Sequence, residues 1–248
     1  MEAATLVKTV IKKRLPRIVK WYRKWAESRA GRHFSGRSPA EVFAEIHDRN
    51  YWGDSHSVSG GGSNLEQTAQ LREFLPLLIR EHGIRSLLDL PCGDFFWMKE
   101  VDLGSCEYVG ADIVDSLVQS NQQLYGRPGR NFLTLDLIAD QLPPVDLIFC
   151  RDCLVHLSVT QIRQALANLF RSGARYLLTT TFPQVGMNRE IVTGQWRPLN
   201  LQRFPFDFPA PLRLFNEGCT QQDGEYGDKS LGLWRLDDLA VAASGRIS

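Results

Sequence analysis

The sequence predicts an α/β fold in which a doubly wound sheet carries a ligand site at its carboxyl edge. Four short apolar segments recur through the middle of the chain, and each carries an acidic residue near its C-terminal end. Glycine and proline lie close to their ends, as is typical of buried strands. The four segments are residues 86–90, 107–113, 131–137 and 145–152.

The first segment contains Asp89 and is followed by a tight loop with Pro91 and Gly93. In open α/β sheets, ligands bind just outside the carboxyl ends of the strands. A carboxylate at a strand end beside a loop of small residues is therefore a candidate ligand site. A buried strand followed by a plain turn explains the same residues, and this segment alone does not decide between the two.

The next three segments favour the ligand site. Asp112 lies about 20 residues after the first loop, the spacing at which nucleotide-binding folds place a carboxylate on the ribose hydroxyls. An ionised carboxylate accepts the two hydrogen bonds that a diol donates. Asp136 and Asp152 lie at the ends of the third and fourth segments. Four strand-end acids at regular spacing are hard to explain as core or solvent-facing residues.

These segments resemble a class I S-adenosylmethionine-dependent methyltransferase over about residues 86–178. The resemblance rests on Leu88-Asp89-Leu90-Pro91-Cys92-Gly93-Asp94, Val109-Gly110-Ala111-Asp112, Leu135-Asp136-Leu137 and Asp146-Leu147-Ile148-Phe149-Cys150-Arg151-Asp152. It implies a Rossmann-like, doubly wound, seven-stranded sheet whose last strand is antiparallel, with an N-terminal helical extension in this chain. The first loop departs from the family, which usually has two or three glycines where this chain has Pro91, Gly93 and Phe95.

The resemblance implies S-adenosylmethionine as cofactor and gives each strand end a role. The first loop passes under the methionine and ribose, Asp112 holds the ribose hydroxyls, and Asp136 lies by the adenine amino group. The end of the fourth strand faces the sulfonium and the acceptor. The implied cofactor-binding residues are Trp52, Arg72, Asp89, Pro91, Gly93, Asp112, Ile113, Asp136, Leu137 and Arg151.

Residues 51–63 are rich in glycine and serine and precede a predicted helix at 65–82. This segment could be a flexible linker, although a linker has little need of Trp52. In several class I methyltransferases the corresponding segment closes over the methionine end, and by that resemblance Ser59, Gly62 and Thr68 join Trp52 and Arg72 as candidates. Arg72 could pair with the cofactor carboxylate or lie on a solvated helix face, and both interpretations stay open.

The remaining elements complete an alternating pattern. Helices are expected at residues 39–48, 95–101 and 114–125, and from Ser158 or Thr160 to 170. Strands are expected at 176–182, 212–219 and 230–236. Residues 188–208 are predicted to form a long loop with aromatic and charged side chains, of the type that makes a lid or an acceptor pocket. Residues 240–248 are expected to form a frayed tail.

Three residues are the predicted catalytic groups, because a hydroxyl acceptor must lose a proton. His156 lies just beyond the fourth strand end, where the methyl group would be, and an unperturbed histidine titrates near neutrality. A helix cap or a packing role would also explain a lone histidine there. Asp152 is the second candidate base, and Glu217, at the end of the strand predicted at 212–219, stands behind both. No metal is required, because the acids serve as cofactor ligands.

Charge divides the chain into two expected regions, a basic extension at 1–37 and a methyltransferase domain at 38–248. Residues 1–37 hold 11 Lys/Arg and 2 Asp/Glu, a net +9, so the remainder carries −8 of the total of +1. Apolar residues at helical spacing predict an amphipathic helix before a linker at 31–38. Its segment 5–26 could lie on an anionic membrane, contact RNA phosphates, or pack on its own domain or a second subunit.

The predicted activity is methyl transfer from S-adenosylmethionine to a small-molecule or glycan acceptor, at oxygen. A domain without basic excess argues against a nucleic-acid substrate, and the missing Gly-x-Gly-x-x-Gly turn argues against an NAD enzyme. The alternative is a non-catalytic Rossmann-like module that binds a membrane or RNA through its basic helix. Five cysteines in a chain of this length favour free thiols, and we expect a cytoplasmic protein, which could also contact the inner membrane surface.

Overall fold

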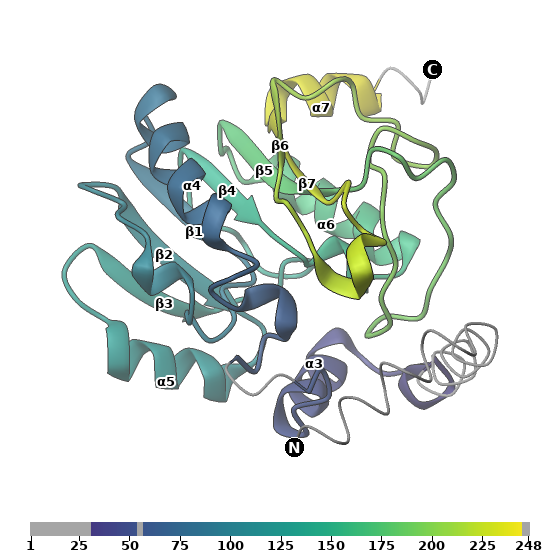
Figure 1. Cartoon of the computed structure of the whole chain (residues 1–248), viewed down its shortest axis with the longest axis horizontal. Helices are drawn as coiled ribbons and strands as arrows, with labels where there is room; N and C mark the ends of the chain where they lie inside the picture. Colours follow the sequence, from purple (N-terminus) through teal and green to yellow (C-terminus); the bar gives the residue numbers. More distant parts are fainter. Residues whose placement is uncertain (1–30, 54–56, 245–248) are drawn as a thin grey trace.

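A computed structural model describes residues 31–53 and 57–244, so the predicted basic helix at 5–26 lies outside the described residues. Seven strands form one sheet in the order β3-β2-β1-β4-β5-β7-β6 (Figure 1). Neighbours from β3 to β5 are parallel, whereas β7 is antiparallel to both β5 and β6. The strands are β1 (Ser86–Asp89), β2 (Glu107–Asp112), β3 (Arg130–Thr134), β4 (Leu147–Cys150), β5 (Tyr176–Thr181), β6 (Arg213–Asn216) and β7 (Ser230–Arg235). This confirms the predicted Rossmann-like doubly wound sheet with an antiparallel last strand.

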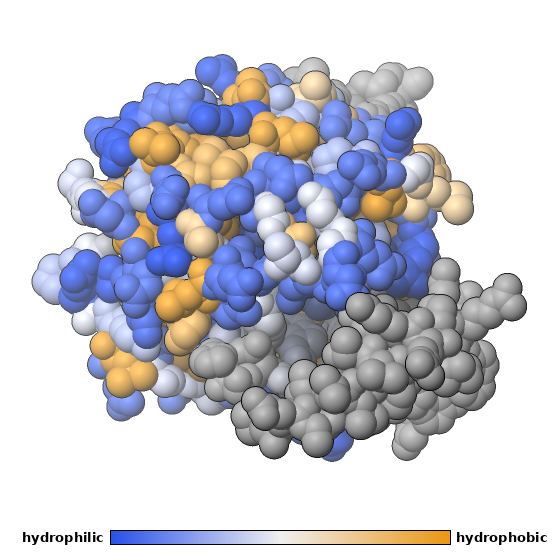
Figure 2. Space-filling model, viewed as in Figure 1, coloured by the Kyte–Doolittle hydropathy of each residue, from blue (hydrophilic) through white to orange (hydrophobic). Residues whose placement is uncertain are grey.

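Successive side chains of each central strand point to opposite faces, and both faces are buried. Leu87 belongs to a core shared with α4 (Ala69–Glu81) and α5 (Asp115–Tyr125), whereas Leu88 belongs to a core shared with α6 (Val159–Arg171) and α7 (Leu236–Ser244). This explains why the strands appear in the sequence as continuous apolar runs. Figure 2 shows one outer face, where hydrophilic residues surround separate small groups of hydrophobic ones.

The predicted helix at 39–48 is confirmed as α3 (Pro39–Asp48). Ser38 caps it in a capping box, because its hydroxyl accepts the backbone N–H of Glu41 while the Glu41 carboxylate accepts the N–H of Ser38. The adjoining linker prediction at 31–38 was wrong in part. Residues 31–34 are helical, and Phe34 is buried against Val42 and Ile46 of α3.

Three other predicted boundaries were wrong for local reasons. The helix expected at 65–82 begins only at Ala69, because Asn64 holds a turn through the backbone N–H of Gln67 and the Thr68 hydroxyl. The helix expected at 95–101 is a short 3₁₀ turn at Met98–Glu100, since Phe95 has φ +56° and cannot belong to a right-handed helix. The expected tail begins inside α7, which continues to Ser244. Within the described residues, none of the helices is both long and apolar enough to cross a bilayer.

A matched pair of substitutions on α4 tests the packing of this helix on the sheet. Leu75 is fully buried and Leu77 is 53% exposed. We expect Leu75→Ala to lower the free energy of unfolding by about 2–5 kcal/mol, because the truncated side chain leaves a cavity. Leu77→Ala should change it by less than about 0.5 kcal/mol. Urea denaturation measures both, and equal losses would contradict the assigned face of the helix.

Candidate active site

A cleft lies outside the carboxyl ends of β1, β2 and β4, where the strand order reverses between β1 and β4. The sheet therefore brings together acids that are far apart in the sequence. Eleven of the thirteen predicted site residues line this cleft, and Arg72 and Glu217 do not. The eleven are Trp52, Asp89, Pro91, Gly93, Asp112, Ile113, Asp136, Leu137, Arg151, Asp152 and His156.

The glycine- and serine-rich segment packs on the loop after β1 and forms part of the cleft wall. Gly93 has φ +55°, and a Cβ there would overlap the Ser59 hydroxyl, so both the turn and the close approach require glycine. The Asp94 carboxylate accepts the backbone N–H of Val58 at 3.0 Å and the Ser59 hydroxyl at 3.3 Å. Of the two interpretations of this segment, its contacts and its place in the wall favour closure over a free linker.

Asp112, at the end of β2, is a buried carboxylate that lines the cleft. Its two oxygens accept the backbone N–H groups of Gly93 at 3.2 Å and Val114 at 3.1 Å. Burial raises the pKa of Asp112, and the backbone hydrogen bonds oppose this. A carboxylate has about four acceptor positions, so Asp112 keeps acceptor capacity for a ligand.

Asp89, at the end of β1, is also buried and receives a hydrogen bond from the Tyr108 hydroxyl at 2.7 Å. Burial raises the pKa of Asp89 to about 7, against the opposing effect of that hydrogen bond. A carboxylate in this state exchanges its proton near neutrality and responds strongly to any ligand that brings a donor or a charge.

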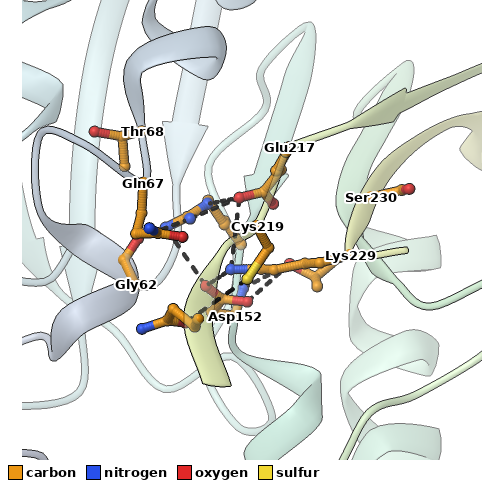
Figure 3. Close-up of polar contacts among 12 residues, drawn as sticks. Gly62, Gln67, Thr68, Asp152, Glu217, Cys219, Lys229 and Ser230 are labelled. Carbon is orange, nitrogen blue, oxygen red and sulfur yellow. Dashed lines mark hydrogen bonds and ion pairs between the residues drawn. The ribbon is translucent and has the colours of Figure 1, made fainter. Parts of the chain in front are cut away.

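Four charged side chains form what we call the buried ion cluster: Arg151, Asp152, Glu217 and Lys229 (Figure 3). Arg151 donates from Nε and Nη2 to Glu217 Oε2 at 3.0 and 2.7 Å. Its Nη2 also donates to the carbonyl of Gly62 at 2.9 Å, and its Nη1 lies 3.4 Å from Asp152 Oδ2. Lys229 Nζ lies 2.5 Å from Asp152 Oδ2 and 3.5 Å from Glu217 Oε2. The cluster is thus neutral overall and ties the end of β4 to the residues that flank the turn between β6 and β7.

Asp152 and Arg151 are the members of the buried ion cluster that line the cleft. The backbone of Asp152 has φ +53°, and its N–H donates to the Thr180 hydroxyl at 2.8 Å, which holds this uncommon conformation. Burial opposes ionisation, but Lys229 and Arg151 outweigh it and lower the pKa of Asp152 to about 2. Asp152 is therefore an anion throughout the physiological pH range and a poor proton acceptor.

Glu217 lies behind Arg151, is 2% exposed, and is not part of the cleft lining. Its Oε2 accepts the Arg151 hydrogen bonds, and its Oε1 has no hydrogen-bond partner among the described residues. The geometry thus places Glu217 where it orients Arg151, which differs from the predicted position facing the acceptor. The physical reason is that a buried guanidinium needs a carboxylate partner.

His156 follows β4 in a short 3₁₀ turn and lines the cleft. Its Nδ1 lies 3.0 Å from the backbone carbonyl of Gln195. A carbonyl only accepts, so Nδ1 carries the proton and Nε2 of the neutral ring keeps a lone pair. Burial lowers the pKa of His156 to about 4, so the ring is neutral at pH 7. The Trp52 and Phe43 rings lie against it, at centroid distances of 5.0 and 6.5 Å.

Arg72, on α4, donates to the backbone carbonyl of Leu65 at 3.1 Å. Its Nε is buried and lacks a hydrogen-bond partner among the described residues. Arg72 lies outside the cleft lining, so its predicted pairing with the cofactor carboxylate stays a prediction.

Three solved structures resemble this chain in fold. Human N-acetylserotonin methyltransferase, in complex with S-adenosylmethionine, is 16% identical with a TM-score of 0.53, over 91% of this chain and 68% of that one. The N-methyltransferase NodS from Bradyrhizobium japonicum WM9, in complex with S-adenosylhomocysteine, is 13% identical with a TM-score of 0.54, over 77% of this chain and 97% of that one. The methyltransferase domain of bacterial Hen1 is 17% identical with a TM-score of 0.51, over 68% of this chain and 97% of that one.

The chain has the fold of the class I S-adenosylmethionine-dependent methyltransferases. No protein-family model and no curated protein matches the sequence. The identities are too low to extend the likeness beyond the fold.

Within this methyltransferase fold, some site residues were missed by the sequence reasoning. Pro39, Phe43 and His47 of α3 line the cleft, and Lys229 holds Asp152 from outside it. The helical spacing that predicted α3 gave no sign that these three side chains face a cleft. No local signal marks Lys229, because it reaches Asp152 across 77 residues of sequence.

The first prediction from this geometry concerns pH. The pKa of His156 is about 4 in the folded protein, against an ordinary value of 6.5, so the unfolded chain binds more protons between these pH values. Its contribution to stability is present above pH 6.5 and is lost as the pH falls towards 4, by at most about 3 kcal/mol. We expect His156→Gln to remove this part of the pH dependence and His82→Gln to keep it.

Urea denaturation at pH 7, 6 and 5 measures these changes. Asp89 titrates over the same pH range but changes the stability in the opposite direction. It is present in the parent and in both variants, so the difference in stability between parent and variant reports on His156. An unchanged pH dependence in His156→Gln would refute the buried, neutral state of the ring.

The second prediction compares a buried with an exposed ion pair. Arg151→Met leaves Glu217 buried without its partner, so we expect the free energy of unfolding to fall by about 3–5 kcal/mol. Arg175→Met breaks the surface pair with Asp146 (3.3 Å, with the Arg175 side chain 54% exposed), which should cost no more than about 1 kcal/mol. Urea denaturation of both variants tests this, and similar losses would mean that the buried ion cluster is not what stabilises this end of β4.

Proposed function

We propose that this protein transfers a methyl group from S-adenosylmethionine to the hydroxyl oxygen of a small-molecule or glycan acceptor. The observation that carries the proposal is the buried carboxylate of Asp112 at the end of β2, beside the loop at Gly93, inside a cleft of this fold. Human N-acetylserotonin methyltransferase and NodS, which share the fold, were crystallised with S-adenosylmethionine and S-adenosylhomocysteine, and this supports the same cofactor here.

The cleft residues fit the parts of such a cofactor. The free acceptor positions of Asp112 would take the ribose hydroxyls. Asp136 would accept from the adenine amino group, with Ile113 and Leu137 beside the ring. Asp89, Pro91 and Gly93 would lie along the ribose and methionine. We propose that Trp52, Arg72 and Arg151 contribute at the methionine end. Arg151 would do so through its place in the cleft wall, because its hydrogen-bond donors are already used within the protein.

Bound S-adenosylmethionine supplies a methyl group on a sulfonium, which is already a good leaving group, so the protein mainly has to align the reactants. Nε2 of His156 would accept the proton that the acceptor hydroxyl loses when the oxygen is methylated. Asp152, ionised and facing the cleft, is suited to hold a donor group of the acceptor. Glu217 positions Arg151, which in turn helps to keep Asp152 ionised.

A cytoplasmic location stays a prediction from the five cysteines, and contact between segment 5–26 and an anionic membrane surface stays a prediction from the basic sequence alone. Vesicle flotation of the full chain, compared with a chain lacking residues 1–30, would test it.

Calorimetric titration of S-adenosylmethionine into the purified protein tests the proposed cofactor. We expect binding by the parent and a loss of about 100-fold in affinity for Asp112→Ala, because two hydrogen bonds to a charged group disappear. Asp115→Ala is the matched control: this exposed acid lies on α5, three residues away and outside the cleft lining, and should bind like the parent. A folded parent that does not bind would end the methyltransferase proposal, and equal losses in both variants would remove Asp112 from the site.

A further inference from the structure

We infer that the acceptor is a planar aromatic molecule that carries a ring hydroxyl and no anionic group. The inference rests on the proposed methyltransferase function and narrows its substrate class. Three features of the cleft lead to it: the side chains that wall the end near His156, the state of the charged groups, and the hydrogen bond that fixes the His156 ring.

The first feature is an apolar wall at the His156 end of the cleft. Asp112 lies on the β2 side of β1, whereas His156 follows β4 on the other side. The helix α3 passes over both ends, since its His47 is close enough to Asp112 to affect the pKa of that carboxyl, and its Phe43 lies edge-on to His156. Pro39, Phe43 and Trp52, which we call the aromatic wall, therefore surround the place where an acceptor would meet His156.

A sugar and an aromatic ring need different contacts from the side chains around them. A sugar exposes hydroxyl groups around its rim, and each one that loses water needs a polar partner. The aromatic wall offers ring faces and a pyrrolidine, which favour contact with another flat, apolar ring. Among the described residues that line the cleft, the polar side chains beyond the end of β4 are His156, Asp152 and Arg151. Asp152 is already paired with Lys229, and Arg151 with Glu217. This suits a single hydroxyl better than the several hydroxyls of a sugar.

The second feature is the absence of an available cation among the described cleft residues. Five aspartates line the cleft, namely Asp89, Asp94, Asp112, Asp136 and Asp152, and they face a single arginine, Arg151. All three nitrogens of that guanidinium are paired, with Glu217, the Gly62 carbonyl and Asp152. A phosphate or carboxylate on the acceptor would meet carboxylates without a free partner, which disfavours nucleotide sugars and other anionic acceptors.

The third feature is the orientation of His156. The bond from Nδ1 to the Gln195 carbonyl leaves Nε2 as a hydrogen-bond acceptor, so the bound molecule must present a donor to it. Burial also lowers the pKa of this ring, which makes it a weak base. A phenol, whose proton is as acidic as that of tyrosine at a pKa of about 10, can be deprotonated by such a base far more readily than an aliphatic alcohol.

The test uses four probes on protein saturated with S-adenosylhomocysteine, so that only the acceptor end of the cleft remains open. They are 2-naphthol, 6-hydroxy-2-naphthoate, 2-methoxynaphthalene and methyl α-glucoside. Equilibrium dialysis gives their affinities. We expect 2-naphthol to bind at least about tenfold more tightly than the naphthoate, which adds an anion, and than the methyl ether, which cannot donate to His156. The glucoside should not bind measurably.

Variants of Trp52 show whether binding occurs at the aromatic wall. Trp52→Ala should weaken 2-naphthol roughly tenfold, and by more than it weakens S-adenosylhomocysteine, whereas Trp52→Phe keeps a ring and should retain most of the affinity. Leu77→Ala, on the exposed face of α4, is the control and should match the parent.

Two outcomes separate this inference from the proposed function. If S-adenosylhomocysteine binds but 2-naphthol does not, or if the naphthoate, the ether or the glucoside binds as tightly as 2-naphthol, the acceptor class is wrong and the methyltransferase proposal stands. If S-adenosylhomocysteine itself fails to bind the folded protein, both the acceptor inference and the methyltransferase proposal are refuted.

Discussion

Arg151 carries a positive charge that is buried at the end of β4, and a buried charge costs several kcal/mol unless it is fully paired. Two of its partners come from distant parts of the chain, Glu217 after β6 and Gly62 before α4, and the third is the neighbouring Asp152. Satisfying one guanidinium therefore fixes the position of the glycine-rich segment against both the parallel and the antiparallel part of the sheet. The walls of the cleft depend on this pairing.

The same cluster separates two titratable groups that lie close together beyond β4. Lys229 and Arg151 keep Asp152 ionised, whereas burial, which outweighs the effect of the Asp152 charge, keeps His156 neutral. Neighbouring groups whose environments shift their pKa values in different ways can take different roles in one reaction. In the proposed reaction, the Asp152 anion would hold and orient a donor, and the free nitrogen of the neutral His156 ring would accept a proton.

Polar and apolar surfaces are also divided within the cleft. Carboxylates gather at the carboxyl edge of the parallel strands, because parallel strands deliver their ends to one side of a sheet. The opposite wall comes from α3 and Trp52, which the chain contributes before the sheet begins. This arrangement suits a polar, cationic cofactor on the sheet side and a flat apolar partner under α3.

The sequence by itself determined the strands of the sheet and the acids at their ends, because period, turn residues and spacing are local properties. Asp89, Asp112, Asp136 and Asp152 were all placed in the cleft on that basis. Tertiary structure decided what those groups face. Lys229 pairs with Asp152, Glu217 turns to Arg151, and Phe43 of α3 lines the cleft. The two ion pairs join residues that lie 77 and 66 positions apart in the chain. No local pattern records such a pairing, since it arises only when separate elements pack together.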